Sequence, residues 1–294
     1  MTSSDPADSG RPRSDRPGSH HPGSDHPGSD HPGSGAAVGP ATLDFTPAPR
    51  AAPFPRMVLA QAGAEIRATL RNGEQLLLTL IIPVLLLVGF SVAPLIDVGG
   101  GSRVAFLAPG VLALAIMSTA FTGQAIATGF ERRYGVLKRL GATPLSRAGL
   151  LMAKTAAVVA VEVLQIVVIV GVALALGWRP QGSPPAAALL LLAATAAFSG
   201  LGLLMAGVLR AEATLAAANL VYLLLLATGG VIFPLSKFPD SVRPVLELLP
   251  ISALTGGLRA VLTGGAALPL GALAILVAWA VVTLGLAACT FRWE

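Results

Sequence analysis

Long stretches without a charged side chain limit what this chain can fold into more than any other feature of its sequence. Five such stretches have apolar cores at residues 75–96, 104–130, 186–209, 213–236 and 268–289. A sixth, 155–178, is interrupted only by Glu162. A helix needs about 20 predominantly apolar residues to cross the hydrocarbon core of a bilayer. The sequence therefore predicts an all-α membrane protein with six transmembrane helices.

The composition excludes most classes of soluble protein. Of the 294 residues, 54% are hydrophobic and only 12% are charged, whereas a soluble domain carries about a quarter charged residues. An ordinary cytosolic enzyme and a chain that is disordered throughout are both excluded on this ground. A secreted disulfide scaffold is excluded because Cys289 is the single cysteine.

Residues 1–55 differ in composition from everything that follows. They are rich in Pro, Gly, Ser, Asp and His, with a near-repeat His-Pro-Gly-Ser at His21, His26 and His31. Such a segment has little apolar surface to offset the entropy of ordering, so we expect a disordered tail (1–55) before a transmembrane domain (56–294). The tail is either plain low-complexity sequence or a metal-capturing segment. Because no histidine follows His31, we expect no histidine-based metal site and no Ser-His-Asp triad in the transmembrane domain.

The basic residues outside the predicted spans divide unequally between the two sides of the membrane. One side collects Arg50, Arg56, Arg67, Arg71, Arg132, Arg133, Lys138, Arg139, Arg147, Lys154, Arg210 and Arg292; the other has Arg103, Arg179, Lys237, Arg243 and Arg259. Loops rich in Lys and Arg stay in the cytoplasm. The sequence thus predicts that both termini are cytoplasmic, and the net charge of +5 reflects membrane orientation rather than binding of nucleic acid.

The segment before the first span, 56–72, has the pattern of an amphipathic helix. Leu59, Ala62, Ile66 and Leu70 recur at helical spacing, with the charged side chains mostly on other faces. Asn72 and Gly73 offer a stop for the helix. The segment is either a helix lying in the cytoplasmic interface or a generic basic anchor.

The loop between the second and third spans carries more pattern than orientation alone requires. Phe130, Tyr134 and Leu137 form an apolar stripe, charged residues surround it, and Gly141 can end a helix before Thr143-Pro144 restarts the chain. A loop that only fixed orientation would need the cations and nothing else. We therefore expect a docking helix over 130–140, with a plain orientation loop as the alternative.

The connection between the fifth and sixth spans contains two short amphipathic segments on the outer side. Val242, Val245, Leu246 and Leu249 form one set, Pro250 breaks it, and Leu254, Leu258 and Val261 form the second. Each set is too short to span a bilayer. The pattern predicts either a re-entrant pair of half-depth helices or two helices on the membrane surface.

Two of these segments resemble the permease subunits of type-2 ABC exporters, and the resemblance covers about 56–294. The run Glu-Arg-Arg-Tyr-Gly-Val-Leu from Glu131, the later Thr143-Pro144 and then Lys154 are similar to the family pattern Glu-Arg-Glu-x-Gly-Thr-Leu, Thr-Pro and Lys, with Arg133 and Val136 departing from it. The second likeness is the sequence from Phe233-Pro-Leu-Ser to Pro239, followed by Leu249-Pro250 and Arg259, which is similar to the outer re-entrant segment of the family.

The resemblance implies an export permease without catalytic residues or cofactors of its own. Two six-helix subunits, either two copies or this chain and a paralogue, would pair in the plasma membrane above two ATPases. The chain has no Gly-x-x-x-x-Gly-Lys-[Ser/Thr] motif, so ATP and Mg would be bound by a separate ATPase. The cargo would be an amphiphilic, drug-like, lipid or polymer substrate.

The resemblance also assigns residues to two sites. Coupling to the ATPase would involve Phe130, Glu131, Arg132, Arg133, Tyr134, Gly135, Leu137, Lys138, Thr143 and Pro144. An outer gate would involve Pro234, Pro239, Pro250 and Arg259. Three other classes stay open as alternatives, namely a secondary transporter or channel, an intramembrane enzyme, and a membrane scaffold. The sequence lacks the usual motifs of an intramembrane enzyme. It also has no convincing internal repeat, which a secondary transporter would be expected to show.

Glu162 is the ionisable residue that falls inside a predicted span. A charged carboxylate near the membrane centre costs about 2.5–3.5 kcal/mol on insertion scales, so it is rarely left facing lipid. One interpretation pairs it with Lys154, eight residues earlier on nearly the same helix face. The other places it, with Gln124, Gln165 and Asn219, on the wall of a translocation path or at a subunit interface.

Overall fold

The computed structural model describes residues 52–93, 102–231 and 235–290, and every regular element within them is helical. The predicted tail lies almost entirely outside these residues, as does Pro234. The elements are α1 (Phe54–Arg71), α2 (Gly73–Val92), α3 (Arg103–Ile116), the π-helix η1 (Met117–Gly123), α4 (Gln124–Arg133), α5 (Val136–Gly141), α6 (Arg147–Ala175), α7 (Pro184–Val208), α8 (Ala211–Thr228), the 3-10 helix η2 (Leu235–Lys237), α9 (Arg243–Glu247), α10 (Pro250–Leu262) and α11 (Leu270–Thr290).

Five of these helices are long and apolar enough to cross a membrane, and the number rises to six if α1 and α2 count as one bent span. The five are the continuous run Arg103–Arg133, α6, α7, α8 and α11. α1 and α2 meet at an angle of 70°, because Asn72 leaves the helical conformation (φ −92°, ψ 73°). Each predicted apolar stretch therefore overlaps at least one helix, and the predicted stop at Asn72 is a bend.

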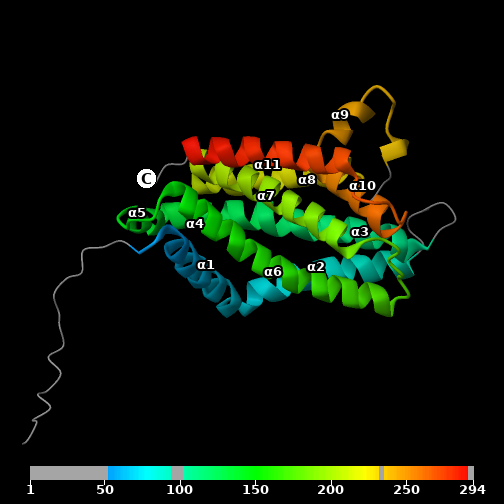
Figure 1. Cartoon of the computed structure of the whole chain (residues 1–294), viewed down its shortest axis with the longest axis horizontal. Helices are drawn as coiled ribbons and strands as arrows, with labels where there is room; N and C mark the ends of the chain where they lie inside the picture. Colours follow the sequence, from blue (N-terminus) through cyan, green and yellow to red (C-terminus); the bar gives the residue numbers. More distant parts are fainter. Residues whose placement is uncertain (1–51, 94–101, 232–234, 291–294) are drawn as a thin grey trace, which may run out of the picture. The chain divides into compact units, whose positions relative to one another are not determined.

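The long helices run side by side, with α5 at one end of the bundle and α9 at the other (Figure 1). α7 packs against α11, α10, η1 and α4 and supplies much of the core. Small residues on α7 allow this close packing, as is usual between membrane helices. A Cβ atom added to Gly200 would lie 2.2 Å from Thr283 Oγ1, and one added to Gly202 would lie 2.7 Å from the carbonyl oxygen of Phe121.

The run Arg103–Arg133 is the most buried span and contains an irregular turn. Its middle, η1, winds as a π-helix, with Met117 and Phe121 fully buried. A π-helical turn shifts the register of the side chains that follow it, and such turns are frequent at functional sites. Here it brings Thr119 within 3.0 Å of Gln165 Oε1 on α6.

The face that α1 presents to the bundle agrees only in part with its predicted apolar stripe, of which Ala62 is the one buried member. Val58 and Ala62 are buried against α6, whereas Leu59 is 71% exposed and Leu70 is also exposed. Glu65 faces the bundle, because Lys154 on α6 supplies it with a cation. The expectation that the charged residues lie mostly on other faces is thus wrong for Glu65.

The two short segments at the α9 end of the bundle are unlike one another. α10 is packed among α3, α7 and α11, with Ile251, Leu254, Leu258 and Val261 fully buried. α9 is a single turn on the surface, with Val242 and Val245 exposed. The break at Pro250 lies where the sequence predicted it, since Pro250 is the first residue of α10. The depth of either helix in a bilayer stays a prediction.

Candidate functional site: the elbow between α4 and α6 and the polar pocket beside it

The segment that joins α4 to α6, residues 130–146, forms a tight double turn that we call the elbow. α4 ends at Arg133, and Gly135 adopts a left-handed conformation (φ 71°) from which α5 starts. Glycine takes this conformation without the steric cost that other residues incur. Ser146 then begins α6 by accepting a hydrogen bond from the Gly149 N–H at 3.1 Å. The single docking helix predicted over 130–140 is therefore two helices with a turn between them.

The apolar stripe predicted for the elbow is divided between the inside and the outside of the chain. Leu137 is fully buried in a cluster with Val58, Leu150 and Leu203, so it is not available to a partner protein. Tyr134 is 67% exposed, and its ring stacks on Phe130 with centroids 6.2 Å apart. The outer surface of the elbow consists of Tyr134, Val136, Lys138, Arg139, Thr143 and Pro144, all of which are exposed.

Two arginines tie the elbow to the neighbouring helices. Arg132 donates hydrogen bonds to the carbonyl oxygens of Ala206, Gly207 and Leu209 at 2.7–2.9 Å. These carbonyls end α7, where no further helical N–H groups can reach them. Arg133 forms an ion pair with Glu212 at the start of α8. Arg132 thus anchors the inner side of the elbow, whereas the ion pair of Arg133 with Glu212 lies on its exposed side.

Lys154 joins three helices through a buried ion triad. Its side chain is 5% exposed, and its Nζ lies 3.0 Å from Glu65 Oε1 on α1 and 2.6 Å from Glu131 Oε2 on α4. The interpretation that pairs Glu162 with Lys154 is wrong. Eight residues along a helix correspond to a rise of about 12 Å, and the two nearer carboxylates already occupy the ammonium group.

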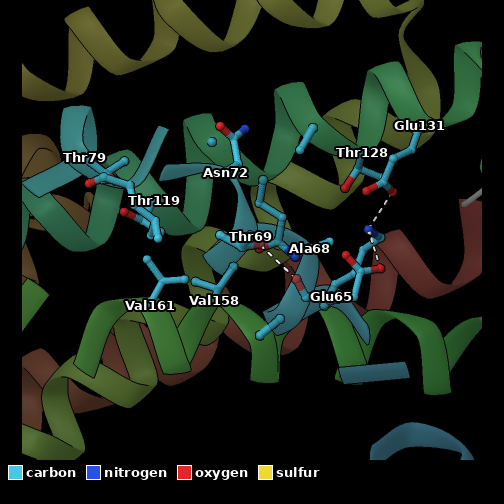
Figure 2. A pocket seen from close by; sticks show the side chains of 16 residues that line it. Glu65, Ala68, Thr69, Asn72, Thr79, Thr119, Thr128, Glu131, Val158 and Val161 are labelled. Atoms are coloured by element: carbon cyan, nitrogen blue, oxygen red, sulfur yellow. Dashed lines mark hydrogen bonds and ion pairs between the residues drawn. The ribbon is translucent and has the colours of Figure 1, made fainter. Parts of the chain in front are cut away.

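A polar pocket of about 250 Å³ lies beside this triad, between α1, α2, α6 and the α4 end of the second span. Figure 2 shows Glu65 and Glu131 approaching one another across it, with Thr79 and Thr119 at the other end. The amide of Gln124 and the hydroxyl of Thr128 are buried and have no hydrogen-bond partner among the described residues. Buried polar groups of this kind are usually satisfied by water or by a polar ligand.

The four residues predicted to line a translocation path lie in different places. Gln165 accepts a hydrogen bond from Thr119 Oγ1 and donates one to the Thr79 carbonyl oxygen, both at 3.0 Å. Gln124 lines the polar pocket. Glu162 faces α7, where Thr195 Oγ1 donates to its Oε2 at 2.5 Å. Asn219 is exposed on α8 and donates to the Leu215 carbonyl oxygen of its own helix. The structure thus places Gln165 and Gln124 near η1, and it places Glu162 and Asn219 elsewhere.

Arg259, one of the residues predicted for an outer gate, is held by contacts to two other parts of the chain. Its Nη1 and Nη2 atoms donate to the carbonyl oxygens of Gly230 and Val231 at 2.7 and 3.0 Å, and its guanidinium lies 3.9 Å from the centroid of the Phe106 ring. It thereby joins α10 to α3 and to the end of α8. Pro239 is exposed, and its carbonyl accepts from the N–H groups of Val242 and Arg243 in the turn before α9.

The sequence held a signal for the ion triad that the apolar pattern concealed. Val58, Ala62, Glu65 and Thr69 recur at spacings of four, three and four residues, which places them on one helix face. This face, with an acidic residue in it, is the one that contacts α6. Thr195 and Thr79 gave no comparable signal, because a threonine in an apolar helix usually bonds to its own backbone.

The described residues contain no group of three or more His, Cys, Asp or Glu side chains that could hold a metal ion. Comparison with curated proteins gives no match to the chain. The family model for the ABC-2 type transporter matches residues 58–263, from the first turns of α1 to the end of α10. This match includes the elbow, the polar pocket and Glu162, and it covers well over half of the chain. The chain belongs to the ABC-2 type transporter family and is a multi-pass permease of an ABC transporter.

Proposed function

We propose that this permease exports an amphiphilic, drug-like, lipid or polymer substrate, driven by a separate ABC ATPase that docks on the elbow. The observation that carries the proposal is the division of the elbow into an exposed outer surface and a firmly anchored inner side. Tyr134 and Val136 with the cations Lys138 and Arg139 are exposed. Exposed tyrosine and arginine residues are typical of the anchors of protein interfaces.

The inner side of the elbow supports transmission of a movement into the bundle. Leu137 is fixed in the core formed with α1, α6 and α7. Arg132 holds the end of α7, and Glu131 holds Lys154 of α6, which also binds Glu65 of α1. A displacement applied at Tyr134 would therefore move several helices together, because packed elements shift as units rather than deform continuously.

The remaining features of the proposed assembly follow from the family and from the charge distribution. A second copy or a paralogue would complete the transport path, and ATP and Mg would be bound by the ATPase rather than by this chain. The elbow and both termini would lie in the cytoplasm and the α9 end outside the plasma membrane, as the excess of basic residues at the elbow end favours.

The proposal is tested by truncating Tyr134 alone. Tyr134→Ala should reduce co-purification of the partner ABC ATPase by at least about tenfold, since loss of an aromatic anchor costs about 2 kcal/mol or more. ATP-dependent transport into inverted vesicles should fall with it. Leu137 is left unchanged in this test. Replacing a buried leucine by alanine lowers the free energy of unfolding by about 2–5 kcal/mol, so a loss of ATPase binding could then result from unfolding instead of from lost docking.

Val245→Ala is the matched control, because Val245 is equally exposed but lies on α9 at the other end of the bundle. It should leave both the binding of the ATPase and the thermal unfolding temperature unchanged. Normal ATPase binding and normal transport in Tyr134→Ala would rule out docking on the elbow.

A further inference from the structure

A second cavity, of about 480 Å³, lies between α6 and α7, and we call it the lateral groove. Its walls are aliphatic, with Val163, Ile166 and Val170 on α6 facing Ala188 and Leu191 on α7. The volume is within the range of sites that hold one small amphiphile. None of the residues lining the polar pocket beside the elbow lines this groove.

The groove is closed at one end and open along its side. The loop between α6 and α7 contacts α10 directly, because the Gln181 N–H donates to the Leu262 carbonyl oxygen at 3.1 Å. A Cβ atom added to Gly182 would lie 1.8 Å from the Val261 carbonyl oxygen, so this end wall fits only glycine. Val163 and Leu192 line the groove and are exposed. A ligand could therefore enter laterally, from the hydrocarbon side of a spanning helix.

Glu162 is the one charged side chain among the described residues that line the groove. It is 3% exposed, its Oε2 accepts from Thr195 Oγ1 at 2.5 Å, and its Oε1 has no hydrogen-bond partner among the described residues. Burying a carboxylate without a countercharge is costly. Since Lys154 is held by Glu65 and Glu131, the nearest basic residue on α6 does not supply that charge.

Trp178 is the second residue lining the groove, after Glu162, that has a buried polar atom without a partner among the described residues. Its side chain is buried near the closed end, and its indole N–H has no partner among the described residues. The ring adds a flat apolar surface to the aliphatic walls, and aromatic faces also attract cations. Thr195, whose hydroxyl contacts Glu162 and the Leu191 carbonyl oxygen, is the third lining residue with a polar side-chain atom, and the other described side chains that line the groove are apolar.

We propose that the lateral groove binds the substrate of this permease and that the substrate is a cationic amphiphile. Its amine would contact Glu162, and its apolar body would lie between α6 and α7. The inference rests on the proposed export function, whose cargo it narrows. An anionic or purely neutral amphiphile is disfavoured, because neither supplies the positive charge that the buried carboxylate lacks.

The test measures binding of two probes with the same alkyl chain. The full chain is reconstituted in phosphatidylcholine nanodiscs, without ATP or ATPase, and saturable binding of radiolabelled dodecyltrimethylammonium and dodecanol is measured. Wild type should bind the permanently charged probe. Glu162→Gln should weaken that binding by at least about tenfold, since charge-assisted contacts are stronger than neutral ones. Dodecanol binding should change less than about twofold.

Three further variants make the result specific. Glu162→Asp keeps the charge and should retain most of the binding of the cation. Ala188→Phe fills the groove from an exposed position and should weaken the binding of both probes. Glu247→Gln removes an exposed carboxylate on α9 and should change neither. Wild-type affinity for the cation in Glu162→Gln would overturn the inference, as would an equal loss of both probes in that variant.

ATP-dependent uptake of the same cation into inverted vesicles separates this inference from the export function. Binding without uptake in the complete assembly would contradict export of this cation while leaving the groove as its binding site. Uptake that survives unchanged in Glu162→Gln would leave export standing and overturn the role of the groove.

Discussion

Lys154 is a buried cation that two carboxylates share. The ammonium group contacts Glu65 and Glu131, and the hydroxyl of Thr69 holds the Glu65 turn by donating to its carbonyl oxygen at 3.0 Å. Such a triad contributes little to the free energy of folding, because desolvation of the charges offsets most of their attraction. Removing one member costs more, because it leaves a buried charge without its partner. The loss of Lys154 would leave two carboxylates facing one another without a cation.

Lys154→Met should therefore destabilise the folded chain by about 3–5 kcal/mol. Replacing Glu65 and Glu131 by Gln in the same variant should restore part of that stability, since no uncompensated charge then remains. Thermal unfolding in detergent measures the change. Arg139→Met is the control, because Arg139 is an exposed cation of the elbow and surface changes stay within about 0.5 kcal/mol. Equal unfolding temperatures for the two variants would contradict the importance of the triad.

The residue scale is also where prediction from the sequence was weakest. The sequence indicated that Glu162 needs a partner, but its partner is Thr195 on α7 rather than Lys154 on α6. Periodicity finds neighbours within one helix, whereas the contacts of Lys154 and Glu162 depend on which helices lie side by side. Only the tertiary arrangement determines that.

The elbow illustrates what can be predicted at the scale of an element. The apolar stripe, the cations and the stop at Gly141 correctly indicated a helix between the second and third spans, since α5 covers Val136–Gly141. The break at Gly135 was missed, because a glycine with positive φ leaves no mark in the pattern of apolar residues. Leu137 was expected to couple to the ATPase together with Phe130 and Tyr134, but it is buried because the turn at Gly135 separates α5 from α4.

Gly135→Ala should test whether the elbow requires its left-handed turn. A Cβ atom at this position would have nothing within 4 Å, so any effect comes from the backbone conformation and not from a clash. The cost should be about 1–2 kcal/mol, and transport should fall because the orientation of α5 would change.

Gly63→Ala provides the comparison for this variant. Gly63 also has free space around it, but it lies inside α1 with an ordinary φ. Alanine is the better helix former by about 1 kcal/mol, so this substitution should stabilise the chain or leave it unchanged. Thermal unfolding and vesicle transport are measured for both. Equal unfolding temperatures and equal transport in the two variants would show that the protein does not require the positive φ of Gly135.

At the scale of the whole molecule, apolar length determined the architecture reliably. Every predicted apolar stretch overlaps a helix, and five helices are long and apolar enough to span, or six if α1 and α2 form one bent span, because a membrane segment must satisfy its backbone within itself or against its neighbours. The apolar stretches did not indicate which helix lies at the centre of the bundle and which lie at its surface. α7 is central because Gly200 and Gly202 allow its neighbours to approach closely, and a helix that is apolar on all sides carries no periodic sign of that.

The orientation of the bundle is the last expectation that can be measured directly. The lone cysteine, Cys289, is replaced by alanine, and single cysteines are introduced at Lys138 on α5 and at Glu247 on α9, two exposed positions at opposite ends of the bundle (Figure 1). In intact cells, a membrane-impermeant maleimide should label Glu247→Cys and should reach Lys138→Cys only after lysis, because the more basic end remains in the cytoplasm. Leu254→Cys, buried in α10, should resist labelling in both conditions. Labelling of Lys138→Cys in intact cells would show that the orientation is the opposite one. The elbow would then lie outside the cell, where no cytoplasmic ATPase could reach it.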